Sequence, residues 1–373
     1  MKQLGYTWLI SHFQLKARPL LHSSFLGTRQ ALRERADGSV EERYVSRYNP
    51  GDDPLDHIVF ALKYDGLDLD IIRKVLQRIP PENVAEFVSR TPTGKYSRQI
   101  GFWFEMLTGR EVPLERNLIG NYTPLLDPQR YVVAPEPARN PRWRILNNAI
   151  GDRRFLPIIR RTKAIRSIEG MDWGGLISET VRPFSDGMLH RALSYLYFKE
   201  TKSSFAIERE ELGTSRTKRF VALLHRAGTE KKPLSEETLT ELQNGMMEER
   251  YRGTGYRTNK NYVGETTVHL QEIIHLIGAP PDFVRDVMEG LQEYFATSEG
   301  SHPLLRAAAI SFPFVFIHPF EDGNGRIHRY IIHDVMARGG IGGKGLILPV
   351  SAQILADMRA YATCLEQFST PLL

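Results

Sequence analysis

The chain has 373 residues with a formal net charge of +5, which is enough for two or three domains and permits acidic partners without requiring nucleic acid. Hydrophobic residues make up 41% and charged residues 25%, a globular composition that excludes wholesale disorder. The single cysteine, Cys364, excludes an intrachain disulfide and a cysteine-based zinc site, and it favours a reducing compartment.

The first ten residues carry one lysine and no apolar stretch followed by a small-residue cleavage site, so they do not form a signal peptide. No apolar run approaches the ~18 residues that a membrane span requires. We therefore expect a cytoplasmic protein with no membrane partner.

Residues 1–115 are expected to form an N-terminal helical region of unknown role. The first fifty residues are polar and rich in arginine, with a strand or hairpin expected around Thr7–Leu15. Apolar residues then recur at spacings of three and four, which predicts helices until Pro80-Pro81 interrupts the pattern. Helices are also predicted over Val84–Val88 and Ile100–Leu107.

A basic segment follows a linker rich in proline, asparagine and tyrosine. Residues Arg139–Arg166 hold nine arginines and lysines against one acidic residue, Asp152. The segment is either a phosphate or nucleic-acid patch, or a solvated helix face with a charged loop. Interspersed apolar residues favour the second interpretation.

Residues 116–373 are expected to form a second domain, and the fold class is mainly α. Turn residues over Gly253–Glu265 predict turns and a short hairpin. Helices are predicted over Gly187–Lys199, Thr214–Ala227, Ser235–Met247, Pro281–Phe295, Pro303–Ile317, Arg326–Met336 and Ser351–Phe368.

Residues 318–329, HPFEDGNGRIHR, combine a glycine-rich turn with the start of a helix. The free backbone N–H groups at the helix start and the helix dipole both favour an anion there. Gly323 and Gly325 have no side chains, so they allow a ligand to approach the backbone closely. Arg326 and Arg329 lie three apart on one helix face and suit phosphates.

Two further side chains of this segment offer chemistry. Asp322 is an oxygen ligand placed where a Mg²⁺ bridging phosphates would lie, and His318 can act as a general base near neutral pH. The alternative is ordinary turn chemistry with a structural histidine.

The segment resembles the Fic family signature, H-x-F-x-[D/E]-G-N-G-R-x-x-R. The fixed positions all match, at His318, Phe320, Asp322, Gly323, Asn324, Gly325, Arg326 and Arg329. The resemblance implies a Fic-type helical core with a short hairpin flap. It also implies an enzyme that moves AMP from ATP to a target hydroxyl and releases pyrophosphate, with His318 as base and Mg²⁺ on Asp322.

The resemblance also implies which residues of this chain would bind each phosphate of ATP. The backbone of Gly323 to Gly325, with Asn324, would form the hole for oxygens of the α- and β-phosphates. Arg326 would pair with the β-phosphate and Arg329 with the γ-phosphate.

An upstream segment is similar to the inhibitory motif of the same family, [S/T]-x-x-x-E-[G/N]. Ser204 and Glu208 stand four apart, on one face of an expected helix near residues 203–212. The resemblance implies that Glu208 pairs with Arg329, blocks the γ-phosphate and places the chain in the family's second class. Arg209 departs from the motif, which has Gly or Asn there.

The hairpin near residues 253–265 would be the flap that aligns the target, with Tyr262, Val263 and Gly264 as the contacting edge. The implied partner is a protein presenting a Tyr, Ser or Thr hydroxyl, and self-modification and a homodimer are compatible with it. Nucleic acid is not expected without a further domain. Other nucleotidyl or phospho-transfer, removal of AMP, and a nucleotide-sensing DNA-associated regulator stay open as alternatives.

Overall fold

The computed structural model describes residues 1–210, 213–266, 272–341 and 345–370. It divides into an N-terminal unit, Met1–Tyr131 with Glu136–Ala149, and a C-terminal unit, Val132–Pro135 with Ile150–Leu373. The boundary expected near residue 115 therefore moves to about residue 150. The reason is packing: Trp143 is fully buried in the N-terminal unit, against Gly101.

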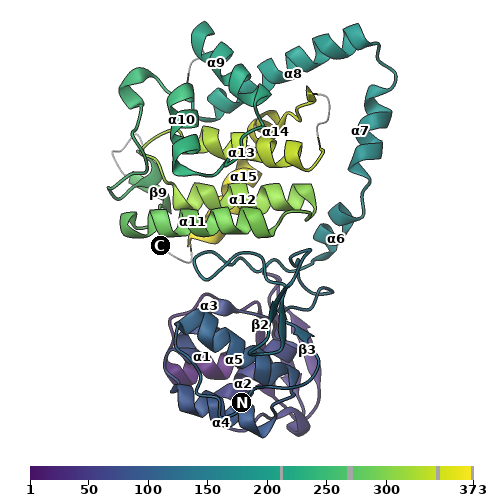
Figure 1. Ribbon diagram of the computed structural model, residues 1–373, viewed down its shortest axis with the longest axis vertical. Helices are drawn as coiled ribbons and strands as arrows, with labels where there is room; N and C mark the ends of the chain where they lie inside the picture. The colour runs from purple at the N-terminus through teal and green to yellow at the C-terminus, as the bar shows by residue number, and fades with distance from the viewer. Residues whose placement is uncertain (211–212, 267–271, 342–344, 371–373) are drawn as a thin grey trace. The chain divides into compact units, whose positions relative to one another are not determined.

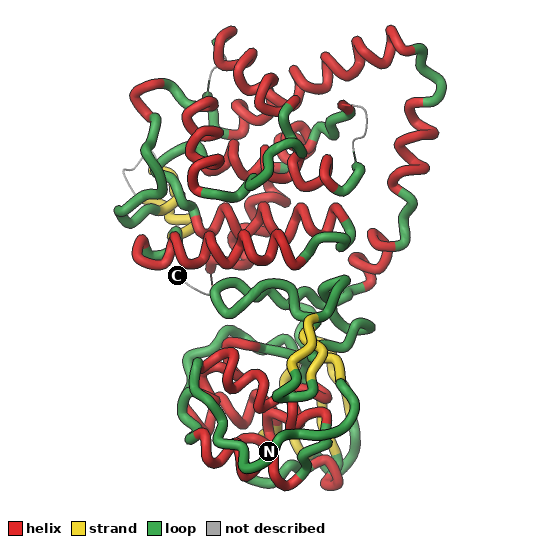
Figure 2. The backbone as a smooth tube through the Cα atoms, viewed as in Figure 1, coloured by secondary structure: helices red, strands yellow, loops and turns green. Residues whose placement is uncertain are grey.

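The N-terminal unit mixes helices with two sheets, so it contains more strands than the helical region with one strand or hairpin that the sequence predicts (Figure 2). One sheet has the order β1-β2-β4-β3 and the other β5-β7-β6. The strands are β1 (Gln3–Leu4), β2 (His22–Leu26), β3 (Ala31–Glu34), β4 (Val40–Tyr44), β5 (Thr123–Pro124), β6 (Ala138–Asn140) and β7 (Ile145–Asn147). Strands such as HSSFL and VEERY carry few apolar residues, which explains why the sequence pattern did not reveal them.

Five helices complete the N-terminal unit. They are α1 (Gly5–Phe13), α2 (Pro54–Tyr64), α3 (Leu69–Leu76), α4 (Pro81–Arg90) and α5 (Lys95–Thr108). The helices predicted over Val84–Val88 and Ile100–Leu107 are confirmed, and the one helical segment expected before Pro80-Pro81 is divided into α2 and α3. Helix α1 replaces the strand or hairpin expected at Thr7–Leu15. Gly109 ends α5 in the left-handed conformation, with φ of 68°.

The C-terminal unit is mainly helical, which confirms the predicted fold class (Figure 1). Its helices are α6 (Lys163–Glu169), α7 (Trp173–Val181), α8 (Asp186–Ile207), α9 (Thr214–His225), α10 (Glu236–Met246), α11 (Pro281–Thr297), α12 (Pro303–Ile317), α13 (Asn324–Arg338), α14 (Val350–Ala356) and α15 (Met358–Ser369). Strands β8 (Tyr262–Thr266) and β9 (Glu272–Ile277) form a two-stranded antiparallel sheet. None of the described helices is long and apolar enough to cross a membrane.

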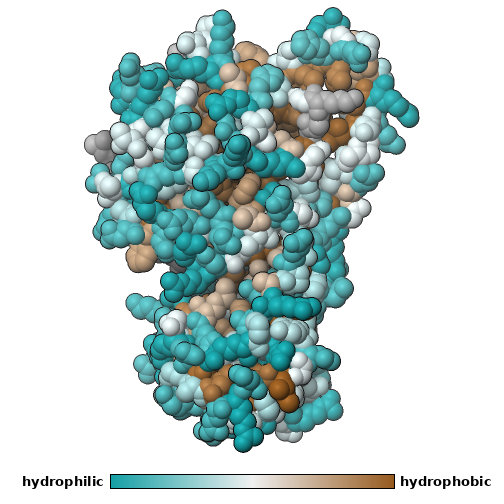
Figure 3. Space-filling view, viewed as in Figure 1, coloured by the Kyte–Doolittle hydropathy of each residue, from teal (hydrophilic) through white to brown (hydrophobic). Residues whose placement is uncertain are grey.

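Helices α12 and α13 form the centre of this unit, and α11 lies beside α12 (Figure 1). Their apolar faces are buried in one core, as Phe314 and Ile327 illustrate with no exposed surface. The outer surface in view is mainly hydrophilic (Figure 3). The short loop between α12 and α13, residues 318–323, is therefore held by two packed helices, which fixes the position of its side chains.

Candidate functional site

His318 ends helix α12 in the left-handed conformation, with φ of 51° and ψ of 59°. Its Nδ1 lies 3.2 Å from the carbonyl oxygen of Val315. Because a carbonyl only accepts, Nδ1 carries the proton in this contact and Nε2 keeps a free lone pair. Burial lowers the pKa of His318 to about 4, so the ring is neutral at neutral pH and can accept a proton.

Arg257, which the sequence did not single out, holds the backbone of His318 in place. Its side chain is buried, and burial lowers its pKa. The guanidinium donates to the carbonyls of His318 at 2.6 Å, Asn259 at 2.6 Å, Ala279 at 2.5 Å and Ile317 at 3.1 Å. Its own N–H donates to Pro319, at 2.8 Å. One residue thus joins the end of α12 to both sides of the hairpin's base.

The N-terminus of α13 lies where the sequence predicts an anion site. Gly323 precedes it with φ of 85°, a conformation that favours glycine. The first helical hydrogen bond comes from Ile327, so the N–H groups of residues 324–326 have no acceptor in the described part of the chain. Three donors therefore point out of the helix end, where the dipole also favours an anion.

The asparagine of this turn has a different role from the one expected. Asn324 Nδ2 donates to the Phe320 carbonyl at 2.7 Å, and its Oδ1 accepts from the Phe320 N–H at 2.9 Å. The side chain of Asn324 therefore closes the loop, and only its backbone N–H faces the anion site.

The two signature arginines are almost fully buried, with 0% of Arg326 and 2% of Arg329 exposed. Glu208 contacts both: its Oε1 lies 2.6 Å from Arg329 Nη2, and its Oε2 lies 2.9 Å from Arg326 Nε. Ser204 Oγ accepts from Arg329 Nε at 2.8 Å. The structure therefore brings Ser204, Glu208 and Arg329 together, as the sequence predicts. Gly325 allows this approach, because a Cβ there would lie 2.4 Å from Glu208.

A second carboxylate, Glu210, was missed by the sequence analysis. Its Oε1 lies 2.9 Å from Arg326 Nη2, and its Oε2 accepts from Arg326 Nη1 at 3.1 Å. Glu210 also pairs with Arg216. Both signature arginines are thus neutralised by carboxylates from one turn of chain.

That turn follows the end of α8, so the helix stops at Ile207 and does not extend over residues 208–212 as expected. Arg209 has a φ of 57°, in the left-handed region. Glycine and asparagine adopt this conformation most readily, which gives a backbone reason for Gly or Asn in the motif. Arg209 adopts the same left-handed backbone conformation that glycine or asparagine would adopt, but at a higher conformational energy.

Helix α8 is fixed to the core through a buried polar cluster one turn before Ser204. Glu200, which is 1% exposed, accepts from Ser351 N at 2.8 Å and lies 2.8 Å from His333 Nε2. Glu200, Ser204 and Glu208 stand four residues apart and so share one face of the chain towards α13. The position of Glu208 is therefore set by the whole helix.

Asp322 has a half-exposed side chain, at 50%. Its Oδ1 accepts from the Gly323 N–H at 2.5 Å, and no described group donates to Oδ2. No cluster of three metal-ligating side chains occurs among the described residues. A lone, accessible carboxylate beside an anion site nevertheless fits Mg²⁺, which keeps waters and takes most other ligands from phosphates.

The hairpin is present but lies further along the chain than expected. Strand β8 begins at Tyr262, and the strands pair with an irregularity between Val263 and Gly264. Tyr262 is 48% and Val263 38% exposed. Residues 253–261 form turns at its base. The three predicted contact residues thus lie on β8 and are accessible, while residues 267–271 lie outside the described part.

The basic segment Arg139–Arg166 is divided between the two units, and many of its cations are paired. Arg154 lies 2.7 Å from Asp152 and 2.8 Å from Glu289. Arg142 pairs with Glu105, and Arg161 with Glu169. These pairs favour the solvated charged loop over a continuous patch for nucleic acid.

A model of the Fic/DOC family matches residues 233–336. Two relatives described as protein adenylyltransferase fic-1, from Caenorhabditis briggsae and Caenorhabditis elegans, are 31% identical over 98 and 97 residues. Each match covers 26% of this chain and 17% of the relative, so the chain spans about a sixth of these relatives.

Two solved structures are also similar. A Fic family protein from Desulfovibrio desulfuricans is 23% identical with a TM-score of 0.43, over 55% of this chain and 66% of that one. A Fic domain containing signaling protein from Bacteroides thetaiotaomicron is 18% identical with a TM-score of 0.37, over 53% and 93%. The segment that matches the Fic/DOC family model, residues 233–336, includes the signature loop at residues 318–329.

Proposed function

We propose that the C-terminal unit transfers AMP from ATP to a hydroxyl of a protein side chain, and that the turn carrying Glu208 restrains this activity. The observation that carries the proposal is the loop between α12 and α13. It brings a neutral histidine, three free backbone N–H groups and two buried arginines to one helix end. The adenylyltransferase named among the relatives supports the same reaction.

In the proposed step, Nε2 of His318 takes the proton from the target hydroxyl as its oxygen attacks the α-phosphorus of ATP. A new phosphorus–oxygen bond forms, and the bond from the α-phosphorus to the oxygen bridging to the β-phosphate breaks. Pyrophosphate leaves and the proton stays on His318. The free N–H groups of residues 324–326 would stabilise the charge that develops on the phosphate oxygens.

Asp322 would hold a Mg²⁺ ion together with phosphate oxygens, and that ion would neutralise phosphate charge. Arg326 and Arg329 would bind the β- and γ-phosphates. Arg257 positions the base by holding the His318 carbonyl at 2.6 Å.

The restraint follows from the ion pairs. A nucleotide phosphate can reach Arg329 only after Glu208 has left, because the carboxylate occupies the guanidinium at 2.6 Å. Arg326 is held by Glu208 and Glu210 together. The target backbone would pair with the exposed strand β8, where Tyr262, Val263 and Gly264 lie, since strand addition tolerates many sequences.

The test uses the purified full chain and ATP labelled at the α-phosphate. We expect weak self-labelling of the unchanged protein, at least tenfold more for Glu208→Gly, and none for Glu208→Gly combined with His318→Ala. The matched control is Glu249→Gly, which removes an exposed carboxylate that forms no ion pair in the described part of the chain. In a parallel reaction with ATP labelled at the γ-phosphate, label retained on the protein would indicate phosphoryl transfer instead. Equal labelling of all variants would contradict the proposal.

A further inference from the structure

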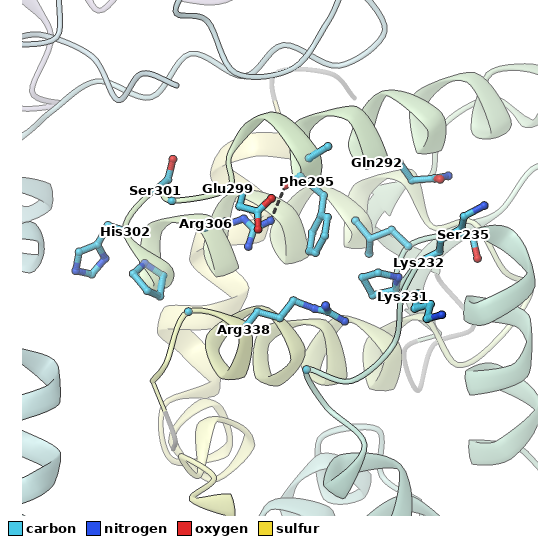
Figure 4. A pocket seen from close by; sticks show the side chains of 17 residues that line it. Lys231, Lys232, Ser235, Gln292, Phe295, Glu299, Ser301, His302, Arg306 and Arg338 are labelled. Atoms are coloured by element: carbon cyan, nitrogen blue, oxygen red, sulfur yellow. Dashed lines mark hydrogen bonds between the residues drawn. The ribbon is translucent and has the colours of Figure 1, made fainter. Parts of the chain in front are cut away.

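A second group of cations lies at the far end of the α12–α13 pair. Helix α13 has 15 residues, so its C-terminus at Arg338 is about 21 Å from the signature loop. A cavity of about 970 Å³ opens there, between the ends of α11, α12 and α13 and the loop before α10 (Figure 4). Its size is typical of a small-molecule site.

Arg306 is the buried cation of this cavity, with 8% of its surface exposed. Its Nε donates to Ser298 Oγ at 2.9 Å and its Nη2 to the Phe295 carbonyl at 2.6 Å. It forms no ion pair with a carboxylate among the described residues. A buried arginine without a counter-ion is costly, and an anionic ligand would offset that cost.

Arg338 is aligned with Arg306 by the same aromatic ring. The guanidinium carbons of Arg306 and Arg338 lie 4.3 Å and 5.6 Å from the centre of Phe295. Arg338 is further held by Asp334, at 2.7 Å. Two guanidinium groups are thus fixed before any ligand arrives, which lowers the entropy lost on binding.

The remaining polar groups surround these arginines (Figure 4). Ser301 and His302 lie at one end of the cavity, Lys231 and Lys232 at the other. Ser301 Oγ and His302 Nδ1 are buried atoms without a hydrogen-bond partner in the described part of the chain. The lining carries four cations and one carboxylate, Glu299; Arg338 is paired with Asp334, so Arg306, Lys231 and Lys232 are the lining cations without an ion pair in the described part of the chain. The lining also has unused hydrogen-bonding capacity.

We infer that this cavity binds a phosphorylated small molecule. The guanidinium and ammonium groups offer more donors than the two oxygens of a carboxylate can accept, whereas a phosphate or diphosphate group has enough oxygens for all of them. The volume exceeds that of a phosphate group, and Leu234 and Pro303 supply an apolar wall for an organic part. The inference does not depend on the proposed transfer reaction, because the two sites share no residue.

The test is calorimetric titration of the full chain with inorganic pyrophosphate, at low salt and without divalent metal. We expect saturable binding that weakens at least tenfold in Lys231→Ala/Lys232→Ala and in Arg338→Gln. The two lysines are exposed, so their replacement leaves the fold intact. The matched control, Lys202→Ala/Lys218→Ala, removes two exposed lysines elsewhere in the same unit and should bind as the unchanged chain does.

Arg329→Ala separates the two sites, because it weakens pyrophosphate binding only if the signature loop is the site observed. Loss of binding in Arg329→Ala with no effect of the cavity variants would overturn the inference. Equal weakening by the control pair would also overturn it, because it would show a general charge effect. Citrate should bind at least fivefold more weakly than pyrophosphate, and equal affinity would contradict a phosphate site.

Discussion

The two ends of helix α13 both have arginines close by, but only at the N-terminal end does each buried arginine contact a carboxylate among the described residues. At the N-terminal end, Glu208 and Glu210 contact Arg326 and Arg329. At the C-terminal end, Asp334 pairs with Arg338, and Arg306 has no acidic partner among the described residues. Under the two proposals, an anion must displace carboxylates at the N-terminal end, whereas at the C-terminal end it meets Arg306 without such a competitor.

The largest effect is expected from a substitution at the N-terminal end of α13, beside the signature loop. In the Glu208→Gly background, Arg257→Lys should lower labelling by about 10- to 100-fold, because a lysine cannot donate to four carbonyls and displacement of His318 costs about this much. The same change should lower the melting temperature and leave pyrophosphate binding at the cavity unchanged.

The matched control for this change is Arg252→Lys, since Arg252 is exposed and its side chain donates to one carbonyl of the described residues, that of Asn244, at 3.2 Å. Unchanged labelling in Arg257→Lys would show that Arg257 does not position the base.

A smaller effect is expected when the second carboxylate at the N-terminal end of α13, Glu210, is replaced. Glu210→Gln should raise labelling about two- to fivefold over Glu208→Gly alone, because it removes the remaining carboxylate from Arg326, and Glu210 is partly exposed. Glu248→Gln is the matched control, as Glu248 pairs with Arg216 at 3.3 Å but not with Arg326. If both substitutions act alike, the restraint comes from Arg216 and not from the signature arginine.

The smallest expected effect concerns pH. The pKa of His318 is lowered from 6.5 to about 4, so its base form persists above pH 4 and is lost as the pH falls through that value. Labelling by Glu208→Gly should therefore change less than about twofold between pH 7.5 and 5.5. A histidine with an ordinary pKa would leave about a tenth of the base form at pH 5.5. A decline centred near pH 6.5 would contradict the assigned protonation state.

Much of the site could be predicted because its residues are close in sequence. His318, Asp322 and the arginines stand within twelve residues, and Ser204 and Glu208 keep helical spacing. Arg257 and Glu210 could not be found in this way, because both lie outside the two matched motifs and contact partners about 60 and 116 residues away. Their roles depend on the packing of α8 and the hairpin against α13, which spacing alone does not encode.

The fold, too, has one part that the sequence predicted and one part that it did not. Helices with regular apolar spacing, such as α12 and α13, were predicted, whereas the sheets of the N-terminal unit were not. Strand β4, VEERY, owes its place to pairing with β2 and β3 and buries only its last residue, Tyr44. Because pairing with neighbouring strands stabilises β4, the strand does not need alternating apolar residues. The apolar pattern of the sequence therefore did not predict it.

The left-handed backbone of Arg209, φ 57°, gives the turn after α8 an energetic bias. A non-glycine residue in this conformation costs about 1 kcal/mol or more relative to glycine, and the turn carries both carboxylates that face α13. An energy of that size corresponds to about a fivefold change in an equilibrium constant at room temperature. We therefore expect Arg209→Gly to shift the equilibrium constant of this turn about fivefold towards the conformation that places Glu208 against Arg329.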